Sequence, residues 1–109
     1  MKDEFVVALT TFPSDKDAAA FAKTLVDERL AACVNILPTM RSIYTWKGVT
    51  ESADECQLVI KTTRARVAEL EARITQLHPY DVPEFIVLPI EAGSPAYLSW
   101  LSDSTERAR

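Results

Sequence analysis

The feature that most constrains this sequence is a pair of long strand-like runs joined by a two-residue turn. The turn is Lys47-Gly48, where glycine tolerates the positive φ that a tight hairpin turn requires. The runs cover residues 33–46 and 49–63, so each has about 14 residues where an ordinary strand has about 5–6. At about 3.3 Å per residue, an unbroken hairpin of this length would reach roughly 45 Å. We therefore expect a hairpin that overhangs its own domain.

Each arm of this hairpin contains one irregular point. Pro38 cannot donate a hydrogen bond to a neighbouring strand, so it predicts an edge strand or a bulge in the first arm. In the second arm, residues 56–60 are the most strand-like, whereas residues 52–54 are polar or small and predict a bulge or a twist.

Apolar periodicity predicts the remaining elements. Ser14, followed by Asp17 three residues later, resembles a capping box at the start of the first helix. Glu69 and Arg73 are spaced as an ion pair on the second helix. The expected strands are 5–9, 33–46, 49–63 and 85–88, the expected helices are 15–29 and 64–77, and a short last helix follows Ser94.

The order of these elements predicts an α+β fold of the ferredoxin-like βαββαβ type with an added C-terminal helix. Right-handed crossovers place the first and third strands in the centre of the sheet and the second and fourth at its edges. We expect one domain over residues 1–109, with 103–109 as a frayed polar tail.

Two apolar surfaces in this arrangement predict self-association. The last strand, 85–88, is apolar on both faces although it lies at an edge, and the hairpin carries Ile43, Tyr44 and Trp46 near its tip. Exposed apolar edges promote strand pairing. We therefore expect the hairpin of one copy to lie against the edge of a neighbour and to close a ring.

Composition excludes several classes of function. A net charge of −4 and a pI of about 4.9 argue against nucleic acid as a partner. Only two residues are glycine, so a glycine-rich phosphate loop cannot be built. The chain shows neither a signal-peptide pattern nor an apolar stretch of about 18–20 residues, which predicts a cytoplasmic protein without a membrane partner.

The candidate metal ligands are few. His78 is the only histidine, so a multi-histidine site within one chain is excluded. It is either a helix-end histidine bonded to the backbone or a ligand contact. Cys33 and Cys56 are expected to be reduced thiols that are either buried and structural or have a redox or metal-ligand role. The spacing of these three residues matches no structural zinc pattern, although their donors suit copper or zinc.

The other candidate site residues also allow two interpretations each. Lys61 and Arg64 flank the start of a predicted helix, which is either an anion site or a solvated strand end with Thr63 as N-cap. Because side chains alternate along a strand, Tyr44 and Trp46 are expected on one face, where they are either interface aromatics or a wall on which a ligand stacks. The following carboxylates are either ligands for a hard cation or a solvated acidic surface: Glu51, Asp54, Glu55, Asp81 and Glu84.

No catalytic motif is present in the sequence, so we expect a protein that is not an enzyme. A nucleophile elbow and a zincin motif are both absent. The remaining enzymatic alternative uses Lys61 and Glu84 as base and acid in a cleft between subunits.

Five strings of residues carry a resemblance over nearly the whole chain. They are Ala31-Ala32-Cys33-Val34-Asn35, Ser42-Ile43-Tyr44-Thr45-Trp46-Lys47-Gly48, Ile60-Lys61-Thr62-Thr63, His78-Pro79-Tyr80-Asp81-Val82-Pro83-Glu84 and Tyr97-Leu98-Ser99-Trp100-Leu101. In this order and at this spacing, the set resembles the CutA family of divalent-cation tolerance proteins.

This resemblance implies a ferredoxin-like subunit, a tight PII-like homotrimer built by strand pairing between subunits, and a link to tolerance of divalent metals, copper above all. It implies no reaction. The copper ligands proposed in the family fall on Thr10, Leu77 and His78 here, so only His78 keeps a ligating side chain. Cys33 matches the family's Ala-Ala-Cys string and is the thiol candidate. Copper or another divalent cation is thus the expected ligand, with His78 and Cys33 as its residues.

An alternative function follows from the likeness to PII proteins. In that interpretation the protein is a trimeric sensor that binds a small anionic ligand in the cleft between subunits. The residues assigned to that cleft are Lys61, Arg64, Tyr80, Glu84 and Trp46.

Overall fold

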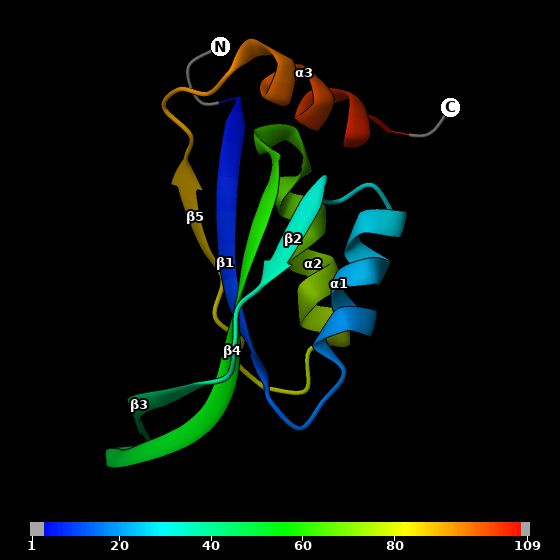
Figure 1. Cartoon of the computed structure of the whole chain (residues 1–109). Coiled ribbons are helices and arrows are strands. Elements are labelled where there is room, and N and C mark those ends of the chain that lie inside the picture. Colours follow the sequence, from blue (N-terminus) through cyan, green and yellow to red (C-terminus); the bar gives the residue numbers. More distant parts are fainter. Residues whose placement is uncertain (1–3, 108–109) are drawn as a thin grey trace.

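The computed structural model describes residues 4–107, which form an antiparallel sheet, three α-helices and one 3₁₀ turn (Figure 1). No helix within these residues is long and apolar enough to cross a membrane. The elements in chain order are β1 (Phe5–Pro13), α1 (Ala18–Asp27), β2 (Cys33–Ile36), β3 (Met40–Trp46), β4 (Val49–Thr63), η1 (Arg64–Arg66), α2 (Val67–Leu77), β5 (Ile86–Pro89) and α3 (Pro95–Ser104).

The sheet has the topology that the sequence predicts. Its strand order is β2-β4-β1-β5, with β3 paired to the other half of β4. The two central strands are therefore β1 and β4, and β5 lies at an edge, as right-handed crossovers require. The α+β, ferredoxin-like prediction is confirmed. β1 is longer than expected, because its pairing with β4 continues to Pro13, and β5 lies one residue later than the expected range.

The hairpin formed by β3 and β4 projects beyond the helices, so the molecule is 44 Å long but only 23–27 Å across (Figure 1). Lys47 and Gly48 form its turn with φ angles of +51° and +79°. The expected overhang is confirmed. Its cause is the length of β4, since the half that pairs with β3 extends past the end of β1.

The first arm of the hairpin is divided into β2 and β3 by a bulge next to Pro38. Ile36 pairs with Leu58 and Met40 pairs with Glu55, so three residues on this side face two on β4. The bulge predicted at Pro38 is confirmed. Of the bulge or twist predicted at residues 52–54, the bulge is excluded, because these residues pair without a break with β3, where an ion pair of 2.9 Å joins Arg41 to Asp54.

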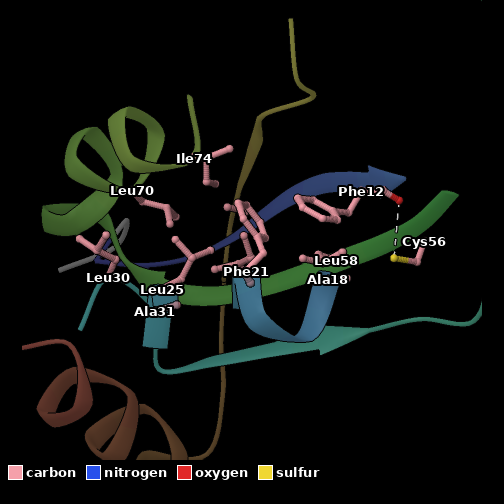
Figure 2. Close-up of a cluster of buried hydrophobic side chains, with 12 residues drawn as sticks. Phe12, Ala18, Phe21, Leu25, Leu30, Ala31, Cys56, Leu58, Leu70 and Ile74 are labelled. Atoms are coloured by element: carbon pink, nitrogen blue, oxygen red, sulfur yellow. Dashed lines mark hydrogen bonds between the residues drawn. The ribbon is translucent and has the colours of Figure 1, made fainter. Parts of the chain in front are cut away.

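The core lies between the sheet and the pair of helices α1 and α2, which cover one face (Figures 1 and 2). Leu25 of α1, Leu58 of β4 and Leu70 of α2 are all fully buried. Cys56 is also buried, and its Sγ donates to the carbonyl oxygen of Phe12 at 3.6 Å. Cys56 is therefore a buried structural thiol, which is one of the two interpretations that the sequence allows. Burial raises the pKa of this thiol.

Side-chain contacts decide where the helices begin, and they differ from the expected ones. The first helix starts at Ala18 rather than at residue 15, because Asp17, not Ser14, caps it by accepting a hydrogen bond of 2.9 Å from the Ala20 amide. It ends at Asp27, two residues earlier than expected, and Arg29 follows with a positive φ of 61°.

The ion pairs on the second helix connect elements instead of stabilising the helix alone. Glu69 pairs with Arg66 at 2.9 Å and with Arg107 at 2.5 Å, so the expected pair with Arg73 is wrong. Arg73 instead contacts Glu28 at the end of α1 through two hydrogen bonds of 2.8 and 2.9 Å. These contacts tie α1 to α2 and the C-terminal segment to α2.

The end of the chain is ordered further than the sequence suggests. The frayed tail expected at 103–109 is wrong for its first residues, because α3 continues to Ser104 and Thr105 is buried. Thr105 Oγ1 lies 3.5 Å from Thr63 Oγ1, so Thr63 packs against α3 and does not cap the following turn with its side chain. Residues 108–109 lie outside the described residues.

Leu58→Ala tests the position of the core. The side chain is fully buried among α1, α2 and β1, so its truncation should lower the free energy of unfolding by about 2–5 kcal/mol. Glu71→Ala, at an exposed position of α2, is the control and should change it by less than about 0.5 kcal/mol. Urea denaturation measures both, and equal effects would contradict this core.

Candidate functional site

An open hollow of about 850 Å³ lies at the root of the hairpin, between the hairpin and the segment 79–84 that leads from α2 towards β5. Six of its lining residues come from this segment. The others lie on strands and are Thr11, Met40, Ser42, Ile43, Tyr44, Trp46, Glu51, Glu55 and Gln57.

Strand register explains why these side chains gather. Side chains alternate between the faces of a strand, so even-numbered residues 40–46 of β3 share one face. Tyr44 lies directly opposite Glu51 of β4, and Met40 lies opposite Glu55. Trp46 follows Tyr44 on the same face. One face of the hairpin thus presents both aromatic rings and carboxylates to the hollow.

The lining is acidic. Glu51, Glu55, Asp81 and Glu84 all contribute to it, and neither lysine nor arginine does. Asp54 is the only one of the five carboxylates considered from the sequence that lies elsewhere, because alternation turns it to the other face of β4, where it pairs with Arg41. A solvated acidic surface therefore describes Asp54, whereas the other four carboxylates line one concave surface.

Glu55 is the most buried of these carboxylates, with 7% of its surface exposed. The Tyr80 hydroxyl donates to its Oε2 at 2.6 Å, and Thr11 Oγ1 donates to the same oxygen at 3.4 Å. Burial of the tyrosine and its hydrogen bond to Glu55 raise the pKa of Tyr80 well above its ordinary value. Tyr80 therefore remains a neutral donor that holds the Glu55 carboxylate in place.

His78 secures the same segment from the other side. Its Nε2 lies 2.6 Å from the carbonyl oxygen of Thr11, and its Nδ1 lies 3.1 Å from the backbone nitrogen of Tyr80. A carbonyl only accepts and a backbone N–H only donates, so the ring is neutral and carries its proton on Nε2. The ring also packs edge-on against Phe12 and Phe21. Of the two interpretations of His78, the structure has the histidine bonded to the backbone.

Gln57 connects the centre of the sheet to the mouth of the hollow. Its Nε2 donates to the Thr10 carbonyl oxygen at 2.8 Å and to Glu84 Oε2 at 2.9 Å. The Glu84 carboxylate is thereby held at the edge of the hollow. The hydroxyl-bearing residue Thr10 itself is fully buried.

The candidate ligand residues fall into two groups. Trp46, Tyr80 and Glu84 line the hollow, whereas Lys61 and Arg64 do not, because they lie towards the other end of β4. The Lys61 ammonium instead donates to the side chain of Asn35 on β2. The structure of one chain therefore does not bring the five residues of the expected anion cleft together.

The candidate metal residues are also apart. Cys33 is half-buried on β2, directly opposite Lys61, whereas His78 lies beside Thr11, whose partner on β4 is Gln57. Both ring nitrogens of His78 are already hydrogen-bonded. Within residues 4–107, no three His, Cys, Asp or Glu side chains are grouped so that they could hold a metal ion.

The lining residues that sequence reasoning does not name at all are Thr11, Gln57 and Met40, whereas Ser42, Pro79, Val82 and Pro83 appear only within the five strings. The signal for Met40 was present, because the alternation that pairs Tyr44 with Trp46 extends back to residue 40. For Thr11 and Gln57 no such signal exists, since their place depends on the register between β1 and β4.

This fold and site define a class of protein: a small ferredoxin-like, PII-like domain with a projecting hairpin and a concave polar surface at its root. Comparison with known families makes the assignment specific. The family described as CutA1 divalent ion tolerance protein matches residues 6–104. The chain belongs to this family, which confirms the resemblance inferred from its five strings.

Individual relatives agree with this assignment. The chain is 48% identical to the divalent-cation tolerance protein CutA of Thermus thermophilus over 99 residues, covering 91% of this chain and 96% of the relative. It is 44% identical to the protein CutA of Mus musculus, covering 91% of this chain and 56% of the relative. The chain thus spans nearly all of the bacterial protein and about half of the mouse protein.

Solved structures are similar over the whole fold. The divalent cation tolerance protein of Thermus thermophilus has a TM-score of 0.90 at 47% identity, covering 94% of this chain and 99% of that one. CutA1 of Oryza sativa has a TM-score of 0.92 at 37% identity, covering 98% of each chain.

Tyr80→Phe tests the buried contact with Glu55. Without the hydroxyl donor, the free energy of unfolding at pH 7 should fall by about 1–3 kcal/mol, because a buried carboxylate loses its shortest hydrogen bond. The raised pKa of Tyr80 means that this stabilisation is complete below the ordinary tyrosine pKa of about 10 and is lost as the pH rises above it.

Urea denaturation from pH 7 to pH 11 measures this effect. The difference between wild type and Tyr80→Phe should shrink above about pH 10. Tyr97→Phe, on the exposed side of α3, is the matched control and should have little effect. A difference that is constant over the whole range would contradict the role of the hydroxyl.

Proposed function

We propose that this protein acts as a homotrimer in the response to divalent metal ions and confers tolerance to them, without catalysing a reaction. The observation that carries the proposal is the match of nearly the whole chain to the CutA1 family. The relative in Thermus thermophilus is named a divalent-cation tolerance protein and is of similar length.

Two unpaired surfaces support the trimer. β5 is an edge strand on which Ile86 and Leu88 each remain 47% exposed, and Ile43 on the hairpin is 72% exposed. A hairpin that overhangs its own domain can extend a neighbour's sheet at such an edge. Repetition of the same contact around a threefold axis closes the ring and covers both surfaces.

Copper is the metal proposed first, and Cys33 is its proposed donor. The thiol is half-buried rather than sealed in the core, and a soft thiolate favours copper. His78 can act as a ligand only if one of its two backbone hydrogen bonds breaks. Its contribution is therefore proposed to be smaller than that of Cys33.

A cytoplasmic location remains part of the proposal. Location varies among relatives, since the one in Arabidopsis thaliana is named chloroplastic and one solved structure, from Archaeoglobus fulgidus, is described as periplasmic. An anionic ligand at the hollow is disfavoured in the single chain, because the four carboxylates would repel it.

Growth in copper tests the function. A bacterial host that lacks its own family member should grow at higher copper concentrations when it expresses this chain, and Cys33→Ala should remove most of that gain. Cys56→Ala changes the other thiol, which is buried in the core, and should retain the gain wherever the protein still accumulates. No gain from the wild-type chain would contradict the proposed tolerance.

Calorimetry separates direct binding from an indirect effect on growth. Cu(I) and Cu(II) are titrated into the wild-type protein, Cys33→Ala and His78→Ala. Binding that Cys33→Ala weakens more than His78→Ala is the expected result. No heat above that of buffer in either oxidation state would exclude direct copper binding.

Light scattering tests the trimer. The wild type should have three times the chain mass of 12.2 kDa at micromolar concentration. Ile86→Lys combined with Leu88→Lys should shift the mass towards one chain, because both side chains are exposed in the single subunit and charges at a covered edge oppose pairing. A wild-type mass of one chain would contradict the proposal, and Glu71→Lys is the control on an exposed helix.

A further inference from the structure

The projecting hairpin is attached to the rest of the subunit through a narrow junction at Glu55. This residue pairs with Pro13, the last residue of β1, and also with Met40, the first residue of β3. Within residues 4–107, the strand residues beyond this point pair only with each other. Figure 1 shows that β4 bends where it leaves β1. We call the projecting part, residues 40–54, the arm.

Both connections to the arm allow a change of direction. On one side, residues 37–39 form the bulge between β2 and β3. On the other side, β4 continues without a break but loses its pairing with β1 after Glu55. Hinges in proteins consist of a few residues at the ends of elements, which absorb changes in backbone angles. The strand pairing alone therefore leaves the direction of the arm adjustable.

A side-chain contact joins this junction to the core. The Tyr80 hydroxyl donates to the nearly buried Glu55 carboxylate at 2.6 Å, and a hydrogen bond to an ionised acceptor is of the stronger kind. Tyr80 is held in turn by His78, which accepts from the Tyr80 amide, bonds to the Thr11 carbonyl oxygen and packs against Phe12. The residue on which the arm would turn is thus tied to the core.

We propose that the contact between Glu55 and Tyr80 is a latch that fixes the direction of the arm, with both as positioning residues. An unlatched arm samples several directions and loses that freedom when it pairs with a neighbour, whereas a latched arm presents Ile43 in one direction at a lower entropic cost. The latch is a property of one chain and does not depend on metal binding. Its effect on assembly rests on the proposed trimer.

Hydrogen exchange, measured by NMR on the full chain, tests the latch. Tyr80→Phe is introduced into the double variant Ile86→Lys, Leu88→Lys, so that no neighbour holds the arm. The Ser14 amide, which bonds across the junction to the carbonyl oxygen of Asp54, should then exchange roughly tenfold faster than in the double variant alone, because the hinge opens more often. Amides that join β1 to the second half of β4 should keep their rates.

Two further variants separate a latch from a general loss of stability. Glu55→Gln keeps the shape of the side chain but offers a neutral acceptor, so it should accelerate the Ser14 amide less than Tyr80→Phe does. Leu58→Ala weakens the core far from the junction and should not act preferentially on that amide. An unchanged Ser14 rate in Tyr80→Phe would overturn the latch, as would equal acceleration of the β1 amides.

A dilution series followed by light scattering tests the effect on assembly. In the otherwise wild-type chain, Tyr80→Phe should raise the concentration at which the trimer dissociates by roughly two- to tenfold, because a smaller fraction of arms points in the competent direction. The same dissociation concentration as in wild type would contradict this effect. A wild-type chain that is a monomer would contradict the trimer and with it this consequence, whereas the exchange rates would still decide the latch.

Discussion

The pairing of β4 with three other strands is the constraint on which the rest of the structure depends. Its 15 residues pair with β3 in the first half and with β1 and β2 in the second. Because side chains alternate, one register places Leu58 and Ile60 in the core and Glu55 and Gln57 on the opposite face. A slip of one residue would exchange these two sets. The core and the hollow are therefore two consequences of the same hydrogen-bond ladder.

The segment after α2 completes the site through a small set of polar contacts. His78 bridges the Thr11 carbonyl and the Tyr80 backbone, and the Tyr80 hydroxyl reaches Glu55. Buried polar groups cost free energy unless they are paired, and these contacts pair them. Among residues 4–107 no buried side-chain nitrogen or oxygen lacks a partner. His78, the only histidine of the chain, thus holds the segment 79–84 in place as one wall of the hollow.

Local patterns in the sequence predicted much of the fold. The Lys47-Gly48 turn, the bulge at Pro38 and the order of the elements follow from backbone chemistry that acts over a few residues. Two of the errors occur where two residues compete for one role. Ser14 and Asp17 can both cap a helix, and Glu69 has arginines within reach on either side. Only the packed structure selects between them. The backbone of Ser14 bonds to Asp54 on β4, and Arg73 pairs with Glu28 on α1, and neither of these partners can be recognised from local spacing.

The sequence by itself determined the family, the length of the hairpin and the alternation that aligns Tyr44 with Trp46, because these depend on residue identity and on the period of an extended chain. Tertiary structure decided which charges meet. Glu51 and Glu84 share one hollow, whereas Lys61 is directed away from it to Asn35. The physical reason is that the approach of the segment 79–84 to β4 depends on long-range contacts made by His78 and Gln57. Those contacts join residues far apart in the sequence, so they cannot be predicted from residue spacing.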